Sequence, residues 1–452
     1  MTALHVSHAL LPDGWARDVT IRIDGTRIAQ VESGAAPGDA ERHAGIAVPG
    51  LANLHSHAFQ RAMAGLAEIG GPEADNFWTW REVMYRFLAR LTPADVEAIA
   101  ALLYAEMLEA GFTAVAEFHY LHHAPDGSPY DDLGEMAARI VAAAASAGIG
   151  LTLLPTLYSQ GGFGGAPPHD GQRRFLNDRD RYLRLVERTR TIARAWRDTI
   201  VGIAPHSLRA VDPDDLAAVV AATPAGPVHI HAAEQRREVD DCVAWSRRRP
   251  VEWLLDHHAI SARWCVVHAT HTTPAELAAL AHSGAVAGLC PITEGNLGDG
   301  LFDLVRFVDA GGRFGVGTDS NILVSPPEEL RLLEYGQRLT RETRNVIAPP
   351  GMSSGRGLFE RARHGGAQAL GRDPAGLAPG ASADIVLLDP EHPSLVGRAG
   401  DAWLDGWIFA ADRGVVRDVW AGGRRVVADG RHVARAALRA RYAATLTAIL
   451  GA

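Results

Sequence analysis

Two histidines, His55 and His57, end an apolar run in the stretch VPGLANLHSHAFQ. In a β-strand, side chains at positions i and i+2 point to the same side, so both imidazoles would project together from one strand end. Two imidazoles on one side can share a metal ion. A histidine pair on a solvated strand tip would have the same spacing, so the pair by itself leaves both interpretations open.

Titratable side chains also end most of the other apolar runs. Active sites of parallel barrels lie at the carboxyl ends of the strands, so this distribution indicates a site. Five further histidines are expected at the surface instead: His169, His257, His258, His282 and His432. The residues at the run ends are Glu117, His119 and Tyr120; His206; His229, His231 and Glu234; His268; and Asp319 with Ser320.

Four of these residues form a donor set for a metal: His55, His57, His231 and Asp319. Three imidazoles and one carboxylate suit Zn²⁺ and also Fe²⁺. If Asp319 binds weakly, one position stays open for a water molecule whose pKa the metal would lower to about 7. We therefore predict one divalent metal ion, preferably zinc. His229 is expected to be a packed or hydrogen-bonded neighbour.

Eight apolar runs alternate with helical stretches between residues 49 and 375. Continuous apolar strands alternating with helices indicate a parallel sheet covered by helices. Eight such units most simply close into a (β/α)8 TIM-like barrel, an α/β fold. An open doubly wound sheet is the alternative, but no Gly-x-Gly-x-x-Gly follows the first run. The runs begin at residues 50, 112, 149, 200, 226, 264, 284 and 313.

Both ends of the chain contain short strand-like runs separated by turns. One example is the alternating stretch around Asp24-Gly25, which predicts a β-hairpin. Because neither end is large enough to fold alone, we predict one small β-sandwich built from residues 1–48 and 376–432. The barrel then spans 49–375, and a C-terminal helix covers 433–452.

The composition of the 452 residues excludes several classes of protein. The net charge is −9 and no basic tract is present, so a nucleic-acid-binding role has no support. Three distant cysteines fit a reducing compartment. No uncharged apolar stretch approaches about 18 residues and no signal peptide is evident, so we expect a cytoplasmic protein without membrane contact.

The motifs PGLANLHSH, HIHAAE, VVHAT and GVGTDS, in this order, resemble the strand-end motifs of the amidohydrolase superfamily, in its deaminase branch. The resemblance implies a mononuclear metal held by His55, His57, His231 and Asp319. It places His268 beside the activated water, and it makes Glu234 a proton shuttle. All 44 basic residues are arginines. The chain therefore lacks the lysine that bridges two metals in many relatives, which disfavours a binuclear centre.

The surrounding stretches HSHAFQRAMAGLAE, NFWTWREVMYRF, AEFHYLHH, APHSLRAV and CPITEGNLGDG resemble the formimidoylglutamate deiminases of histidine degradation. This resemblance implies hydrolysis of N-formimino-L-glutamate to N-formyl-L-glutamate and ammonia, and it implies a homodimer. Arginine forks bind carboxylates in a bidentate manner, so Arg81 and Arg209 are the expected clamps for this dicarboxylate. Gln60 and Tyr120 would add hydrogen bonds. His206 would contact a carboxylate or the formimino nitrogen.

The hypothetical reaction uses three groups. Water loses a proton to Asp319 or His268 and attacks the formimino carbon, and Glu234 protonates the departing nitrogen. Two alternatives stay open: an aminohydrolase of a purine, pterin or triazine-type ring, and a non-catalytic barrel that binds a metal or metabolite. In the segment after the first run, Phe77, Trp78 and Trp80 are expected to pack against the barrel, although lids also form in such insertions. Arg61 is expected to point away from the site.

Overall fold

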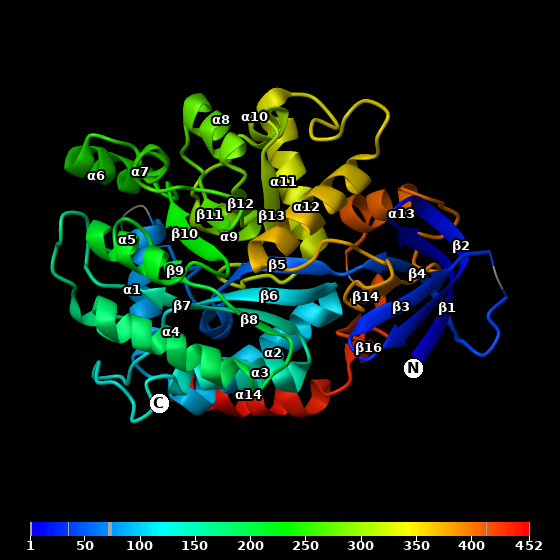
Figure 1. Ribbon diagram of the computed structural model, residues 1–452, viewed down its shortest axis with the longest axis horizontal. Coiled ribbons are helices and arrows are strands. Elements are labelled where there is room, and N and C mark those ends of the chain that lie inside the picture. The colour runs from blue at the N-terminus through cyan, green and yellow to red at the C-terminus, as the bar shows by residue number, and fades with distance from the viewer. Residues whose placement is uncertain (1, 35, 71–74, 413, 452) are drawn as a thin grey trace.

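The computed structural model describes residues 2–34, 36–70, 75–412 and 414–451. Figure 1 shows two parts side by side, a strand cylinder ringed by helices and a smaller group of strands that contains the N-terminus. The chain passes from the smaller part into the cylinder and returns to the smaller part before it ends in a helix under the cylinder.

The apolar runs of the middle of the chain form parallel strands. Two ladders, β5–β6–β7–β8 and β10–β11–β12–β13, are joined by parallel bridges from Ile203 to Val228 and from Ser56 to Asp319, which close a barrel. The predicted (β/α)8 fold is therefore confirmed. The strands are β5 (Leu51–Ser56), β6 (Phe112–His119), β7 (Gly150–Leu157), β8 (Thr199–Val201), β9 (Ala204–Pro205), β10 (Val228–Ala232), β11 (Trp264–His268), β12 (Val286–Leu289) and β13 (Arg313–Val316).

The fourth run, expected as one strand, is divided into β8 and β9. Gly202 lies at the break, where a Cβ would approach Pro227 O to 2.5 Å. The backbone passes too close to its neighbour for any side chain. Of these two strands, β9 is the one that pairs with the carboxyl end of β7. The position of β9 therefore determines the position of His206, the next residue.

Helices surround the barrel. Local signals define several of them: Thr92 and Asp95 form a capping box at the start of α2, and Gly111 ends it with φ 103°. The elements are η1 (Ala58–Met63), α1 (Phe77–Leu88), α2 (Pro93–Ala110), α3 (Glu135–Ala147), η2 (Asp170–Gln172), α4 (Arg179–Ala193), α5 (Pro213–Ala222), α6 (Arg236–Ser246), α7 (Pro250–His257), α8 (Pro274–Ser283), α9 (Pro291–Leu297), α10 (Leu304–Asp309), α11 (Pro326–Arg341), α12 (Ser354–Leu370), α13 (Ala402–Asp405), η3 (Gly406–Ala410) and α14 (Arg435–Leu450).

The strands from the two ends of the chain form one eight-stranded sheet in the order β17-β16-β15-β14-β4-β1-β2-β3. The predicted hairpin at Asp24-Gly25 connects β2 and β3. Apolar side chains from both ends of the sequence share one core, so this sheet curls over itself. The domain limits at residues 48, 376 and 433 stay predictions. The strands are β1 (Thr2–Leu11), β2 (Gly14–Asp24), β3 (Arg27–Glu32), β4 (Glu41–Pro49), β14 (Ile385–Leu388), β15 (Val416–Ala421), β16 (Arg424–Ala428) and β17 (Arg431–His432).

His432 was expected at the surface, and this prediction is wrong. The side chain is buried, and its Nε2 lies 2.8 Å from Ala147 O at the end of α3. Because a carbonyl only accepts hydrogen bonds, Nε2 carries the proton and satisfies an open carbonyl of the helix end. The contact joins two segments that are 285 positions apart, so no local sequence pattern predicts the burial of His432.

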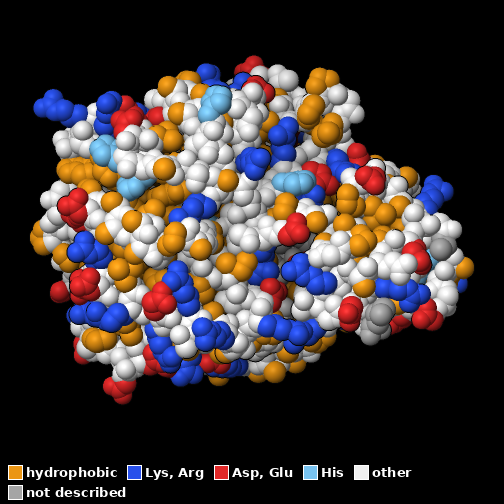
Figure 2. Space-filling view, in the orientation of Figure 1, with side chains coloured by type: hydrophobic (Ala, Val, Ile, Leu, Met, Phe, Trp, Pro, Cys, Tyr) orange, Lys and Arg blue, Asp and Glu red, His pale blue; other side chains and the backbone are white. Residues whose placement is uncertain are grey.

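The outer surface carries charges of both signs. Figure 2 shows arginines and carboxylates interspersed on the visible face, without a large field of one sign. Among the described residues, no helix combines the length and hydropathy that a membrane span requires.

Candidate metal centre and substrate pocket

Three imidazoles converge at the carboxyl ends of the barrel strands. Nε2 of His55 lies 3.2 Å from Nε2 of His57 and 3.1 Å from Nε2 of His231. All three side chains are buried, and burial lowers the pKa of each, for His57 to about 3. The rings are therefore neutral at pH 7. Three neutral imidazole nitrogens this close together could hold a metal ion.

Backbone carbonyls orient two of these rings. His57 Nδ1 lies 2.9 Å from Phe118 O, and His231 Nδ1 lies 2.9 Å from His206 O. Each Nδ1 must donate to its carbonyl, so the lone pair of each Nε2 points to the shared centre. The tautomers needed for metal binding are thus held by the backbone. This observation supports the fit between the donor set and a metal ion.

Asp319 completes the donor set from the end of β13. Its Oδ1 lies 3.6 Å from His55 Nε2 and 3.4 Å from His57 Nε2. Its backbone has φ 44°, a conformation that costs energy for a residue with a Cβ. Asn321 supports this turn, since its Nδ2 donates to Asp319 O at 2.9 Å and to His57 O at 3.1 Å. Burial raises the pKa of Asp319 to about 7.

His268 lies among three carboxylates beside the centre. Its Nδ1 lies 3.2 Å from Glu294 Oε1, whereas its Nε2 lies 3.8 Å from both Asp319 Oδ2 and Glu234 Oε1. Burial lowers the pKa of His268, but the charges of Glu234, Glu294 and Asp319 outweigh burial and raise it to about 10. The imidazole can therefore pass a proton between two carboxylates. His268 also has φ 68°, which places strain at this strand end.

One pocket opens onto these groups. Its lining includes ten of the predicted site residues, and His55 lies behind them. The pocket encloses about 50 Å³, well below the about 300–1,000 Å³ of ordinary small-molecule sites. Residues of α1 form one wall of this pocket. The predicted residues in the lining are His57, Gln60, Arg81, Tyr120, His206, Arg209, His231, Glu234, His268 and Asp319.

The two predicted arginine clamps face the same space from different elements. Arg209 follows β9 and is buried, with Nη2 3.4 Å from Glu234 Oε2. Arg81 lies on α1, and its Nε has no hydrogen-bond partner among the described residues. Gln60 Nε2 donates to Tyr120 OH at 2.9 Å beside them. Burial and the charge of Arg209 lower the pKa of His206, so its ring is neutral.

Aromatic side chains of α1 contribute more to the site than expected. Phe77 and Trp80 line the pocket, and Trp80 also packs against the barrel core, as expected. Trp78 lies between two guanidinium groups, with its ring 4.6 Å from Arg81 Cζ and 4.8 Å from Arg237 Cζ. Such cation–π contacts join α1 to α6 across the pocket.

Several residues that contact the site were not predicted as site residues from the sequence. Arg61 does point away from the pocket, yet its Nη1 donates to Asn321 O at 3.2 Å, next to Asp319. Glu294 contacts His268, and Glu238 accepts from Glu234 N at 3.0 Å. The motif CPITEG that contains Glu294 was noted, and Glu238 follows Glu234 by one helical turn. Nothing in the sequence around Arg61 indicates its contact.

Besides His55, three of the predicted strand-end residues lie outside the pocket lining. Glu117 accepts from Ala58 N at 2.6 Å and from Tyr104 OH at 3.1 Å, so it supports the turn after His57. The ring of His119 packs against His122 at 5.2 Å between centroids. His229, as expected, is packed elsewhere, with Nε2 2.8 Å from Ala369 O.

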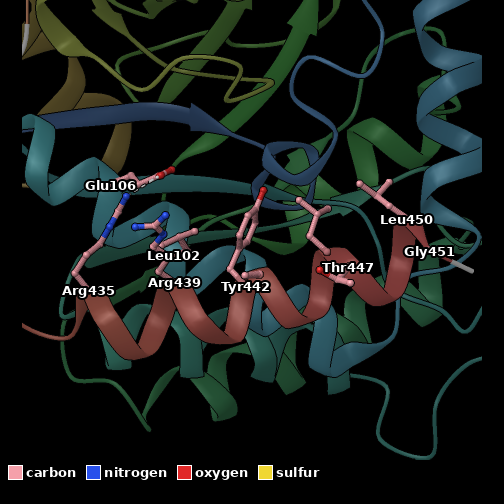
Figure 3. Close-up of a pocket in the computed structure, with 10 residues that line it drawn as sticks. Leu102, Glu106, Arg435, Arg439, Tyr442, Thr447, Leu450 and Gly451 are labelled. Atoms are coloured by element: carbon pink, nitrogen blue, oxygen red, sulfur yellow. Dashed lines mark hydrogen bonds and ion pairs between the residues drawn. The ribbon is translucent and has the colours of Figure 1, made fainter.

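A roomier groove of about 660 Å³ lies between α2 and α14, away from the strand ends (Figure 3). Figure 3 shows Arg435, Arg439 and Tyr442 of α14 facing Leu102 and Glu106 of α2. Arg435 Nη2 and Glu106 Oε1 form an ion pair at 3.4 Å. No histidine or cysteine is among its described lining residues, so the groove lacks the donors of the metal centre.

Comparisons with known proteins agree with this geometry. The model of the amidohydrolase family matches residues 46–426, and the model described as the N-terminal domain of formimidoylglutamate deiminase HutF matches residues 1–45. A formimidoylglutamate deiminase of Pseudomonas aeruginosa is 54% identical over 96% of each chain. A crystal structure of an amidohydrolase from Brucella melitensis is 54% identical, covers 100% of both chains and has a TM-score of 0.96. An adenosine deaminase from Xanthomonas campestris with bound zinc shares the fold at 21% identity, with a TM-score of 0.80 and coverage of 100% and 99%.

Proposed function

This chain belongs to the amidohydrolase family and to the formimidoylglutamate deiminases within it, and from that membership we propose how its site works. The reaction is the hydrolysis of the carbon–nitrogen bond of N-formimino-L-glutamate, which yields N-formyl-L-glutamate and ammonia. The observation that carries the mechanism is the convergence of three neutral imidazole nitrogens beside Asp319, His268 and Glu234.

The metal, for which we propose Zn²⁺ with Fe²⁺ as the alternative, would be held by His55, His57, His231 and Asp319. When bound, a divalent ion of this kind supplies Lewis-acid activation of water at neutral pH. The first three residues form a group that could hold a metal, and zinc is bound in a relative of the same fold. Metal analysis of the purified protein distinguishes zinc from iron.

The protein's own groups move the protons. Water gives a proton to Asp319 Oδ2 as its oxygen attacks the formimino carbon, because the raised pKa of His268 keeps that imidazole protonated at pH 7. This proton passes through His268 to Glu234, which gives it to the departing nitrogen. The carbon–nitrogen bond then breaks, ammonia leaves, and the new hydroxyl group gives its proton to Asp319 as the formyl carbonyl forms. Glu294 fixes His268 through Nδ1, and Nε2 therefore faces both Asp319 and Glu234, at 3.8 Å each. A proton accepted at Asp319 can return to the leaving nitrogen along this short path.

The clamp for the substrate consists of Arg81 and Arg209. Each guanidinium can bind one carboxylate of the substrate through two parallel hydrogen bonds. Among the described residues Arg81 forms no ion pair with an acidic residue, so its charge is free to pair with a substrate carboxylate. Gln60, Tyr120 and His206 line the same space and orient the substrate by hydrogen bonds.

The decisive experiment is an ammonia assay with N-formimino-L-glutamate. The purified protein should release ammonia and N-formyl-L-glutamate in equal amounts, lose this activity on chelation and regain it with Zn²⁺. Ammonia from guanine, adenosine-type or triazine compounds without reaction of N-formimino-L-glutamate would instead favour the ring aminohydrolase. Metal binding without hydrolysis of either class would favour the non-catalytic barrel.

Two further proposals concern the protein in solution. By resemblance, the protein is a homodimer that works in the cytoplasm. Light scattering at several concentrations tests the dimer, and a monomer at all of them contradicts it.

A further inference from the structure

A second group of metal-binding side chains lies beside the first, at the ends of three neighbouring strands. His268 ends β11, Cys290 follows β12 and Asp319 follows β13. One ligand atom of each lies within 4.8 Å of the other two, and all three side chains are buried. We propose that His268, Cys290 and Asp319 form a second, weaker metal site, and that a divalent ion bound there inhibits the enzyme.

The orientation of Asp319 allows one carboxylate to serve both sites. Its Oδ1 faces His55 and His57, whereas its Oδ2 lies 3.8 Å from His268 Nε2. The two oxygens of one carboxylate can therefore bind two different ions. Glu234 Oε1, also 3.8 Å from His268 Nε2, is available as a fourth ligand.

Glu294 holds two of the three ligands together. Its Oε1 lies 3.2 Å from His268 Nδ1 and accepts a hydrogen bond from Cys290 N at 3.0 Å. The imidazole of His268 and the backbone of Cys290 are therefore bound to one buried carboxylate, which keeps the two residues adjacent. These contacts of Glu294 form in the folded chain without a bound metal.

The donor types favour Zn²⁺ or Co²⁺. A thiolate, an imidazole and a carboxylate are ordinary zinc ligands, with bond lengths of about 2.0–2.3 Å that place ligand atoms about 3.3–3.8 Å apart. An ion must therefore draw atoms that are up to 4.8 Å apart closer by roughly 1 Å. The first site starts from nitrogens 3.1 and 3.2 Å apart and needs no such change, so it fills first.

Charge balance also favours a second cation. On binding, the Cys290 thiol and His268 Nε2 each lose a proton to the buffer, because a metal binds the thiolate and the neutral imidazole. The resulting thiolate and the carboxylates of Asp319, Glu234 and Glu294 together balance two divalent ions. A second ion therefore does not leave uncompensated charge in the buried centre.

The consequence for activity follows from which groups the second ion occupies. His268, Asp319 and Glu234 move the protons in the proposed mechanism, and a metal on them blocks this movement. This consequence, unlike the binding itself, rests on the proposed function. Ammonia release should fall by about 100-fold or more at saturation, the scale of lost acid–base catalysis.

The test uses the metal-depleted full chain and Co²⁺, since a cobalt–thiolate bond gives a near-ultraviolet charge-transfer band. The first site contains no sulfur, so the first equivalent of Co²⁺ should restore ammonia release without this band. The second equivalent should produce the band, bring the bound metal to two ions per chain and lower the activity. Cys265→Ala is the matched control, because Cys265 is equally buried on β11 but outside the group. It should keep the band and the second ion.

The Cys290→Ala variant should bind one ion and show no band. Absence of the band in the wild-type chain at saturating Co²⁺, its persistence in Cys290→Ala or its loss in Cys265→Ala would overturn the proposal. If Cys290→Ala does not fold, the wild-type titration and Cys265→Ala still decide it. Failure of the first equivalent to restore ammonia release would instead contradict the proposed function, so the two failures are distinguishable.

Discussion

Glu238 Oε1 lies 3.9 Å from Arg209 Nε, and neither atom has a hydrogen-bond partner among the described residues. Both side chains are buried, and Arg209 also contacts the proposed proton shuttle Glu234 at 3.4 Å. Burial lowers the pKa of Arg209, but the charges of Glu238 and Glu234 raise it overall. Glu238 therefore stabilises the charge of Arg209 and directs its fork toward the pocket.

Replacing Glu238 with glutamine tests this positioning role. The glutamine oxygen can still accept from Glu234 N, but the charge beside Arg209 is lost. We expect the KM for N-formimino-L-glutamate to rise about tenfold, equivalent to about 1.4 kcal/mol, with a smaller change in kcat. Steady-state ammonia release measures both constants. Asp241→Asn on the same helix is the control, because the one ion pair of Asp241 within the described part of the chain is with the exposed Arg237. An unchanged KM in Glu238→Gln would contradict the role.

Replacing Glu234 with glutamine removes the proposed proton donor without removing a proposed metal ligand. We expect kcat to fall by about 10²–10⁴-fold, the usual contribution of a general acid or base. Metal analysis of the same preparation should show unchanged zinc content. Near-normal turnover would rule out the proton shuttle, and loss of zinc would show that Glu234 holds the metal.

The arginine clamps can be assigned by pairing variants with a shortened substrate. Arg81→Gln and Arg209→Gln should each lower kcat/KM by about 30–1,000-fold, which corresponds to about 2–5 kcal/mol for a broken buried charge pair. N-formimino-4-aminobutyrate lacks the α-carboxylate. With this substrate, replacing the arginine that binds the α-carboxylate should lower kcat/KM much less. Arg86→Gln serves as the control, since Arg86 is an exposed arginine on the same helix as Arg81 and does not line the pocket. Equal losses with both substrates would contradict separate clamps.

Metal removal should lower the stability of the folded chain as well as its activity. The converging nitrogens exist only in the folded state, so a metal at 1,000 times its Kd adds about 4 kcal/mol to the free energy of unfolding. Chelation should therefore lower the Tm, and Zn²⁺ should restore it. His231→Ala should lose most of this response. A Tm that is insensitive to chelation in the zinc-loaded protein would contradict a site at these residues.

Acid should destabilise the fold through buried histidines such as His119. Burial lowers the pKa of His119 to about 4 from 6.5 in the unfolded chain. Between pH 4 and pH 6.5 the unfolded state therefore binds more protons than the folded state. The contribution of the buried, neutral His119 to the free energy of unfolding is complete above pH 6.5 and is lost as the pH falls to 4. The loss reaches about 3 kcal/mol. Urea unfolding across this range should show a flatter pH dependence for His119→Leu. The exposed His282→Gln should behave like the wild type.

The sequence by itself determined the fold class and which residue types gather at the strand ends. The alternation of apolar runs and helices indicates a barrel, and strand ends of a parallel barrel meet at one rim. The i, i+2 spacing of His55 and His57 requires them to share a side. These predictions depend only on local geometry, which short stretches of sequence encode.

Only the tertiary structure decided how the rim is arranged. The 3.9 Å approach of Glu238 to Arg209, the contact of Arg61 with Asn321 and the burial of His432 join segments with no shared local pattern. The placement of α1 over the pocket likewise depends on contacts from Trp78 to Arg237 of α6. Such distances follow from the packing of whole elements against one another, and packing depends on side chains throughout the core.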